Sequence, residues 1–259
     1  MAQYRRPSRL GTRKIQEIRH EDIDELHRWI TLDRQTPVRA NRTVEVLRRL
    51  FNLPVRWSWR SDNPAIGIKR NTEEKRQRYL SPDEIARLTT ALDGHAEQTS
   101  ARALKFLLLT GARRGEVLGA TWDMFDLDAG VWTKPAAFTK QRKLHRVPLS
   151  SPALSIMRLL RTQADGDYVF PGAAGKPLTD VKRTWAAVCK AAGISGVRIH
   201  DLRHTYASIL ASSGLSLPVI GALLGHTQPQ TTARYAHLLD DTVASRNRAC
   251  RSPGVLRVR

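Results

Sequence analysis

Three basic side chains crowd the start of an apolar helical pattern in HDLRHTYASILASSG, residues 200–214. His200 and Arg203 lie one helical turn apart, so both can point at one anion near the helix start, where the backbone also favours negative charge. His204 points elsewhere, and we expect it to make a buried hydrogen bond. The apolar positions at helical spacing predict the packed face of this helix: Leu202, Tyr206, Ile209 and Leu210.

A second candidate group lies in TGARRGEVLGATW, residues 110–122, where a glycine break precedes two charged residues. Arg113 and Glu116 are three apart, so on a new helix they share a face. An arginine can hold two phosphate oxygens with its planar fork, which a lysine cannot do. An ordinary ion pair within the helix is the alternative, and this motif alone leaves both interpretations open.

Lys140 lies in the basic segment TKQRK, residues 139–143, on the expected turn between two strands. A lysine there could reach a phosphate or a leaving oxygen as a mobile proton donor. The alternative is that Lys140 belongs to an ordinary charged hairpin tip that is exposed to solvent.

The fourth stretch is LLGHTQPQTTARYAHLL, residues 223–239. Gly225 breaks a helix, His226 follows immediately, and Tyr235 lies nine residues after His226 on the next expected helix. Taken alone, this pattern favours an ordinary tyrosine of an amphipathic helix.

The charge of the chain favours a nucleic-acid partner. Its 259 residues contain 43 Lys+Arg against 24 Asp+Glu, a formal net charge of +19. Such an excess repels itself unless a polyanion offsets it. A ribosome-associated or merely basic protein is the alternative, whereas membrane-surface binding is disfavoured because the charge is spread along the chain.

Further features of the sequence point to a cytoplasmic protein. No apolar run approaches the roughly 18 residues that span a membrane, and MAQYRRPSRLGTRK at the start lacks the apolar core of a signal peptide. Cys189 and Cys250, with no CxxC pair or His/Cys cluster, argue for a reducing compartment and against a structural zinc site.

A small helical domain is expected at the N-terminus. Residues 21–30 and 41–51 both show helical periodicity. Pro54 is expected to end or kink the second helix, and Trp57 and Trp59 are expected to be core contacts. Polar, non-periodic residues follow, so we place this domain in residues 1–65 and a linker in residues 66–79.

A larger domain, residues 80–259, is predicted to be mainly α with a small antiparallel β-sheet. Ser81 is a good N-cap, Pro82 suits the first helical position, and Glu84 completes a capping box. An apolar helix over Ala103–Leu109 stops at Gly111, and two short strands flank the TKQRK turn. Further helices are expected at residues 152–164, 179–192, 200–213, 217–224 and 231–240.

Together, the four stretches resemble the tyrosine recombinase family, the phage-type integrases. The family's signature is a T-G-x-R-x-x-E box, a hairpin lysine, H-x-x-R, a G-H pair and a tyrosine. In this sequence, those positions are Thr110–Glu116 with Arg113, then Lys140, His200, Arg203, His226 and Tyr235. The surrounding DYVFPG, HDLRHTYAS and LLGHT also resemble the family. The resemblance covers residues 80–240 well, and residues 11–70 resemble part of its core-DNA-binding domain.

The resemblance implies site-specific DNA recombination, for integration or excision, by a clamp around double-stranded DNA. It implies that Tyr235 attacks the scissile phosphate, that Arg113 and Arg203 hold the nonbridging oxygens, and that Lys140 protonates the leaving oxygen. His200 would assist proton transfer and His226 would hydrogen-bond the phosphate. The implied assembly is a homo-tetramer on two sites, with accessory DNA-bending proteins as further candidate partners. No metal or other cofactor is implied.

One departure concerns the N-terminus. The family's DNA-binding domain opens with a helix before the segment that resembles LGTRKIQEI, and many integrases carry a further arm-binding domain upstream. Because this sequence starts too late for either, we expect a truncated N-terminal region, as a truncated gene, a fragment or a compact form, of a prokaryotic or phage-encoded protein. Type IB topoisomerase-like relaxation and a non-catalytic DNA-binding remnant are the alternatives. The residues after Tyr235 are a candidate segment for docking on a neighbouring subunit, or a basic tail.

Overall fold

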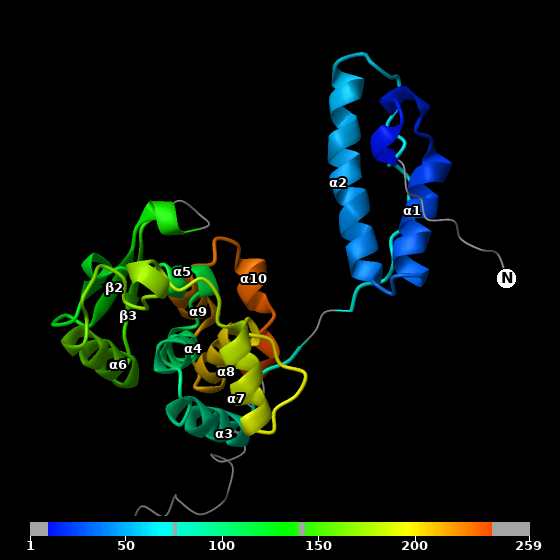
Figure 1. The fold of residues 1–259 in the computed structure, drawn as a ribbon. Coiled ribbons are helices and arrows are strands. Elements are labelled where there is room, and N and C mark those ends of the chain that lie inside the picture. The colour runs from blue at the N-terminus through cyan, green and yellow to red at the C-terminus, as the bar shows by residue number, and fades with distance from the viewer. Residues whose placement is uncertain (1–9, 75–76, 140–142, 240–259) are drawn as a thin grey trace, which may run out of the picture. The chain divides into compact units, whose positions relative to one another are not determined.

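A computed structural model describes residues 10–74, 77–139 and 143–239 (Figure 1). The chain divides into two compact units, Met1–Arg76 and Gln77–Arg259. Lys140 and the tail after residue 239 therefore lie outside the described residues, and the expectations for them stay predictions.

The first unit is built on two packed helices, α1 (His20–Leu32) and α2 (Pro37–Arg56). Short 3-10 turns at Leu10–Thr12 and Ile15–Glu17 precede them. Both helices were expected from their apolar periodicity. They contribute Ile23, Val44 and Phe51 to the small core, which Ile18 and Ala65 complete from outside the helices.

The end of α2 differs from the sequence-based expectations in two respects. Pro54 does not end the helix, which continues to Arg56. A proline this close to a helix end removes one backbone hydrogen bond without disturbing further turns. Trp57 and Trp59 are 54% and 56% exposed, so they are not core contacts. Their rings instead pack on each other, with centroids 4.8 Å apart.

Hydrogen bonds of the first unit extend into the expected linker. Asn71 donates from Nδ2 to Oγ1 of Thr31 at 2.8 Å, and its backbone N–H donates to Oδ1 of Asn41 at 2.9 Å. Asn41, which is fully buried, donates in turn to Oε1 of Glu73 at 2.8 Å. By these contacts, residues 71 and 73 belong with the two helices.

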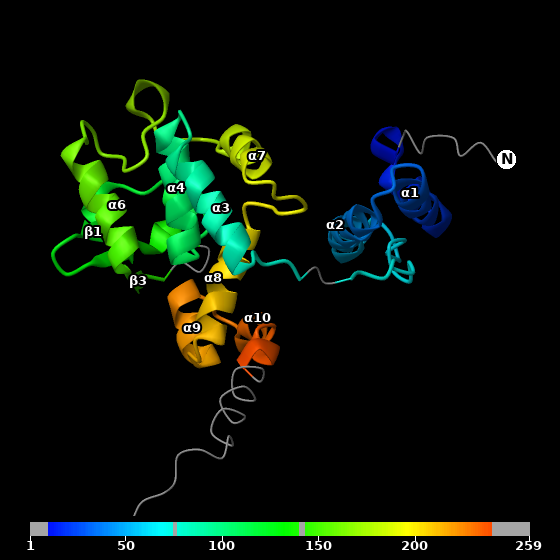
Figure 2. The same ribbon diagram turned by 90° about the horizontal axis from the view of Figure 1, so that it is seen from below.

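The second unit has α4 (Gln98–Thr110) at its centre. It packs against α3 (Pro82–Asp93), α6 (Ser151–Thr162), α7 (Lys182–Ala191) and α8 (Asp201–Ser212), an arrangement visible in Figure 2. The capping box at the start of α3 is confirmed: Ser81 and Glu84 each accept from the other's backbone N–H.

A three-stranded antiparallel sheet, in the order β1-β2-β3, confirms the expected small sheet. Its strands are β1 (Phe125–Asp126), β2 (Val131–Lys134) and β3 (His145–Pro148). In β2, Trp132 and Lys134 are buried while Val131 and Thr133 are more exposed, so alternation places the Trp132 and Lys134 side chains on the inner face.

Shorter helices complete the unit: α5 (Arg114–Leu118), α9 (Leu217–Leu224) and α10 (Pro229–Ala233). The expected helix over residues 231–240 is interrupted, because α10 ends at Ala233 and a turn at residues 234–235 precedes a further helical stretch at 236–239. Tyr235 therefore lies in a turn and not on a helix. Ile209, expected on the packed face of α8, is exposed. Among the described residues, no helix is both long and apolar enough to cross a membrane.

Candidate active site

Two helices end at the candidate site with a glycine in the left-handed conformation. Gly111 caps α4 at φ 60°, and Gly225 caps α9 at φ 66°. Glycine adopts this conformation without the steric cost of a Cβ. Close packing also requires glycine at both positions, because a Cβ at Gly111 would overlap the Tyr206 ring and a Cβ at Gly225 would lie 2.9 Å from Cε1 of His145.

Arg203, in the first turn of α8, joins these two helix ends. Its Nη1 donates to the carbonyl of Gly111 and its Nη2 to the carbonyl of Leu224, each at 2.7 Å. The carbonyl ends of helices carry partial negative charge, so a buried guanidinium is well placed there. Arg203 is 5% exposed, and burial lowers its pKa to about 10. It therefore remains charged at neutral pH and is held rigidly.

Arg113 is the residue that precedes α5, and it is held more loosely. Its Nη1 donates to Oε1 of Glu116 at 2.7 Å, and its Nη2 reaches the carbonyl of Gly225 at 3.4 Å. The Arg113 side chain is 28% exposed. The ion pair expected as the alternative is thus confirmed, and the Arg113 side chain stays partly exposed. A phosphate contact by Arg113 stays a prediction.

Glu116 holds a second cation that the sequence reasoning missed. Its Oε2 lies 2.7 Å from Nζ of Lys134, and both side chains are almost fully buried. Burial acts to raise the pKa of Glu116, but Lys134 and Arg113 together hold that pKa below its usual value. The alternation of Trp132 and Lys134 along the strand was the one signal in the sequence that placed this lysine inside.

Tyr235 is 2% exposed, and its hydroxyl oxygen lies 2.6 Å from Nδ1 of His204. His204 therefore makes the expected hydrogen bond, which is partly buried, but the expectation that it points away from the site is wrong, because its partner is the candidate nucleophile. Burial lowers the pKa of His204 to about 4, so the imidazole is neutral at neutral pH. Burial raises the pKa of Tyr235, while Arg234 and Arg203 act in the opposite direction.

The other two histidines flank this pair. His200 immediately precedes α8, is exposed, and packs edge-to-face on His204 with ring centroids 5.0 Å apart. His226 follows the Gly225 cap, and its Nδ1 lies 2.8 Å from Oγ1 of Thr232. Burial, with a smaller effect of Arg203, lowers the pKa of His226 to about 4.

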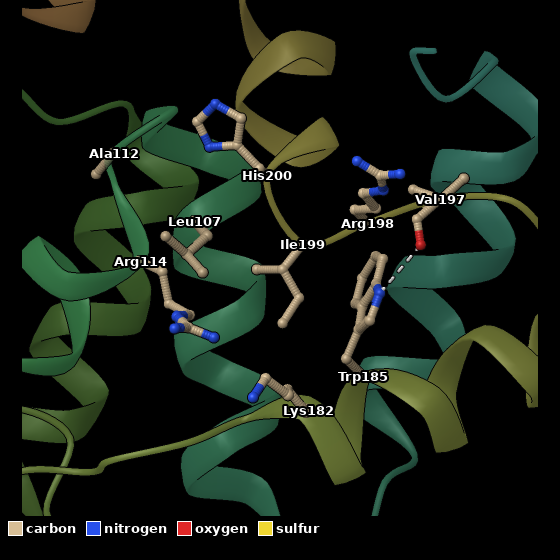
Figure 3. Close-up of a pocket in the computed structure, with 9 residues that line it drawn as sticks. All are labelled: Leu107, Ala112, Arg114, Lys182, Trp185, Val197, Arg198, Ile199 and His200. Atoms are coloured by element: carbon tan, nitrogen blue, oxygen red, sulfur yellow. Dashed lines mark hydrogen bonds between the residues drawn. The ribbon is translucent and has the colours of Figure 1, made fainter. Parts of the chain in front are cut away.

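Beside His200 lies an open pocket of about 520 Å³ (Figure 3). Its floor is apolar, and Trp185 is fixed there by donating from Nε1 to the carbonyl of Val197 at 3.3 Å. Three basic side chains line it: Arg114, Lys182 and Arg198. The site thus continues into a surface that carries positive charge.

The structure brings five of the six sequence-predicted site residues into one region: Arg113, His200, Arg203, His226 and Tyr235. The sixth, Lys140, is outside the described residues. Within the described ranges, no group of three or more His, Cys, Asp or Glu side chains is placed to hold a metal ion. The region places positive charge beside the buried hydroxyl of Tyr235, and charge of this sign suits a phosphodiester.

Known proteins with sequences similar to this chain include integrases and tyrosine recombinases. The chain is 29% identical over 211 residues to the prophage integrase IntA of Escherichia coli (strain K12), covering 76% of this chain and 51% of that protein. It thus spans about half the length of that relative. It is 27% identical over 232 residues to the tyrosine recombinase XerD of Vibrio cholerae serotype O1 (strain ATCC 39315 / El Tor Inaba N16961), covering 83% of this chain and 76% of XerD.

Solved structures share the fold. The Tn1549 transposon integrase in complex with a circular intermediate DNA matches with a TM-score of 0.75 and 18% identity, over 93% of this chain and 88% of that one. A lambda integrase tetramer bound to a Holliday junction matches with a TM-score of 0.69 and 19% identity, over 83% of this chain and 66% of that one. Residues 78–242, which include every candidate site residue, match the model of the phage integrase family. This chain therefore belongs to the phage integrase family.

Proposed function

We propose that this chain cuts and rejoins double-stranded DNA at specific sites, with Tyr235 as the nucleophile. The observation that carries the proposal is that two arginines lie in the region of Tyr235. Both contact carbonyls at the ends of the two glycine-capped helices: Arg203 binds those of Gly111 and Leu224, and Arg113 that of Gly225. The hydroxyl oxygen attacks the scissile phosphorus, the bond to the 5′-oxygen breaks, and a 3′-phosphotyrosyl enzyme and a free 5′-hydroxyl result.

The residues around Tyr235 divide the work of this step. Arg113 and Arg203 hold the nonbridging oxygens and stabilise the charge that builds on them. Lys140 protonates the leaving 5′-oxygen. His200 assists proton transfer at the tyrosine, and His226 hydrogen-bonds the phosphate. Such help is needed because a tyrosine with a pKa near 10 is a weak nucleophile at neutral pH.

Tyr235 must move before it can react. Its hydroxyl lies against His204, and the side chain is almost fully buried, so a phosphate cannot reach the oxygen in this conformation. The turn at residues 234–235 between two short helical stretches is the element that can shift. The arginines, in contrast, are tied to backbone carbonyls and can stay in place.

The covalent intermediate permits strand exchange, because it keeps the energy of the phosphodiester and another 5′-hydroxyl can reverse the step. Recombination of two sites in this way requires four active subunits, so we propose a homo-tetramer on DNA. The lambda integrase tetramer on a Holliday junction, similar in fold, supports this assembly. The bacterial and phage integrases among the relatives support action in a prokaryotic cytoplasm.

The test is trapping of the covalent adduct on a nicked DNA substrate whose short cleaved fragment diffuses away. Tyr235→Phe removes one oxygen and should abolish the adduct while noncovalent binding persists. Tyr206→Phe is the matched control: Tyr206 packs beside Gly111 in the same unit, and we expect its adduct to persist. Peptide mapping should place the DNA 3′-end on Tyr235. An adduct that survives in Tyr235→Phe, or a 5′-linked adduct, overturns the proposal.

A further inference from the structure

Lys134 is a buried cation that the mechanism above does not use. Its side chain is 2% exposed, its Nζ lies 2.7 Å from Oε2 of Glu116, and the same nitrogen lies 4.3 Å from the centroid of the Trp132 ring. The other carboxylate oxygen of Glu116 accepts from Arg113. One carboxylate is thus shared between a buried lysine and an arginine of the site.

The charges of this cluster show what the lysine changes. Arg113, Arg203 and Lys134 carry three positive charges against the one negative charge of Glu116, a net of +2. Without Lys134, the carboxylate would offset one arginine and leave a net of +1. The groups are close enough to interact, because Arg203 and Arg113 both act to lower the pKa of Lys134. Burial strengthens such interactions.

We propose that Lys134 is a positioning residue that offsets Glu116, so that Arg113 and Arg203 present their full charge to the scissile phosphate. The inference rests on the proposed cleavage of DNA at this site. Glu116 has its own purpose, because it orients Arg113 through Nη1 and through the backbone N–H of Arg113. Lys134 allows the site to keep that orientation without losing the charge.

A purely structural role for Lys134 explains the arrangement less well. A buried ion pair is often no more stabilising than apolar side chains of the same volume, so packing alone does not call for a lysine here. A role as proton donor to the leaving oxygen also fits poorly, since Nζ is held by Glu116 and is shielded from solvent.

The experiment measures cleavage rates on three nicked DNA substrates. The first has an ordinary scissile phosphate. The second has a methylphosphonate there, which lacks the negative charge. The third has sulfur in place of the leaving 5′-oxygen, a leaving group that needs no proton. The proteins are wild type, Lys134→Met, Lys134→Met/Glu116→Gln and Lys105→Met. Lys105 pairs with Asp93 away from the site, so Lys105→Met is the control for loss of a paired lysine.

On the ordinary phosphate, Lys134→Met should cleave about 10- to 100-fold more slowly than wild type, because one nearby charge is lost. On the methylphosphonate, the loss should shrink to about threefold or less, since less charge then needs to be stabilised. The thio leaving group should not restore the rate. Lys134→Met/Glu116→Gln regains a net of +2 and should recover to within about tenfold of wild type. Lys105→Met should match wild type.

Equal losses on phosphate and methylphosphonate would mean a structural role and would overturn the inference, as would no loss at all. Rescue by the thio leaving group would make Lys134 a proton donor and would also overturn it. If Lys134→Met fails to fold, Lys134→Met/Glu116→Gln provides the test. Its ratio of cleavage rates on the ordinary phosphate and on the methylphosphonate should equal that of wild type, and a different ratio would overturn the inference. Absence of cleavage by wild type would instead refute the proposed function itself.

Discussion

Replacement of Arg203 by lysine should cost both stability and activity, whereas the same change at Arg113 should cost mainly activity. Arg203 makes two buried hydrogen bonds, to carbonyls from two different helix ends. A lysine keeps the charge but has no planar fork, so it cannot serve both carbonyls in this geometry. One buried acceptor is then left without a partner.

The expected loss of stability in Arg203→Lys follows from this one unpaired acceptor. An unsatisfied buried acceptor costs about 1–3 kcal/mol, so Arg203→Lys should destabilise the larger unit by about 2 kcal/mol. In a domain of this size, that corresponds to a fall in Tm of about 4–8 °C. Arg113 is partly exposed, and a lysine can still pair with Glu116, so Arg113→Lys should change Tm by about 2 °C or less.

Thermal unfolding followed by circular dichroism measures these shifts, and adduct formation on the nicked substrate measures activity. Both variants should lose most cleavage, because a lysine cannot hold two phosphate oxygens at once. An Arg203→Lys variant that unfolds at the temperature of wild type, or an Arg113→Lys variant that is the less stable of the two, would contradict the structural role of Arg203. Near wild-type cleavage by either variant would return that arginine to a structural role.

Three further outcomes are expected. DNA affinity should fall steeply and log-linearly with salt, as titrations by fluorescence anisotropy would measure, and a salt-independent affinity would contradict phosphate neutralisation. Adduct formation should persist in EDTA, because Arg113 and Arg203 supply the positive charge at the phosphate, and loss that magnesium restores would contradict this. Stability should fall as the pH is lowered from about 6.5 to about 4. Burial lowers the pKa of His204 and of His226 to about 4 from an ordinary 6.5, so the unfolded chain binds more protons in that window. In Tm measurements across this range, His204→Gln should show a weaker pH dependence than wild type, and an unchanged slope would refute the assignment to His204.

Local signals in the sequence predicted those parts of the fold that local interactions determine. Ser81 and Glu84 form their capping box within four consecutive residues, and Gly111 ends α4 by its own backbone conformation. The end of α2 was mispredicted because Pro54 was weighed without its distance from the helix end. Trp57 and Trp59 were expected inside on hydrophobicity alone, but burial depends on what packs against them.

The candidate site was predictable as a set of residues but not as a geometry. Nothing local in the sequence shows that Arg203 binds carbonyls 92 and 21 residues away, at Gly111 and Leu224. The same holds for Lys134, which meets Glu116 only because the strand alternation and the packing of α5 coincide. Tyr235 was expected on a helix, yet it lies in a turn with its hydroxyl against His204. These contacts arise from tertiary packing.

The fold and the chemistry of this site share the same groups. The Gly111 and Gly225 caps direct helix-end carbonyls inward, and those carbonyls need a donor because they are buried. Arg203 is that donor, and within the described residues two of its five N–H groups are engaged with them, at Gly111 and Leu224. The remaining donors lie on the same fixed plane, and contact of a phosphate with them is part of the proposed mechanism. Assembly of the helix ends therefore requires the buried guanidinium of Arg203, whereas Arg113 is partly exposed and pairs with Glu116 at the start of α5. For this reason, variants of Arg113 separate activity from stability and variants of Arg203 cannot.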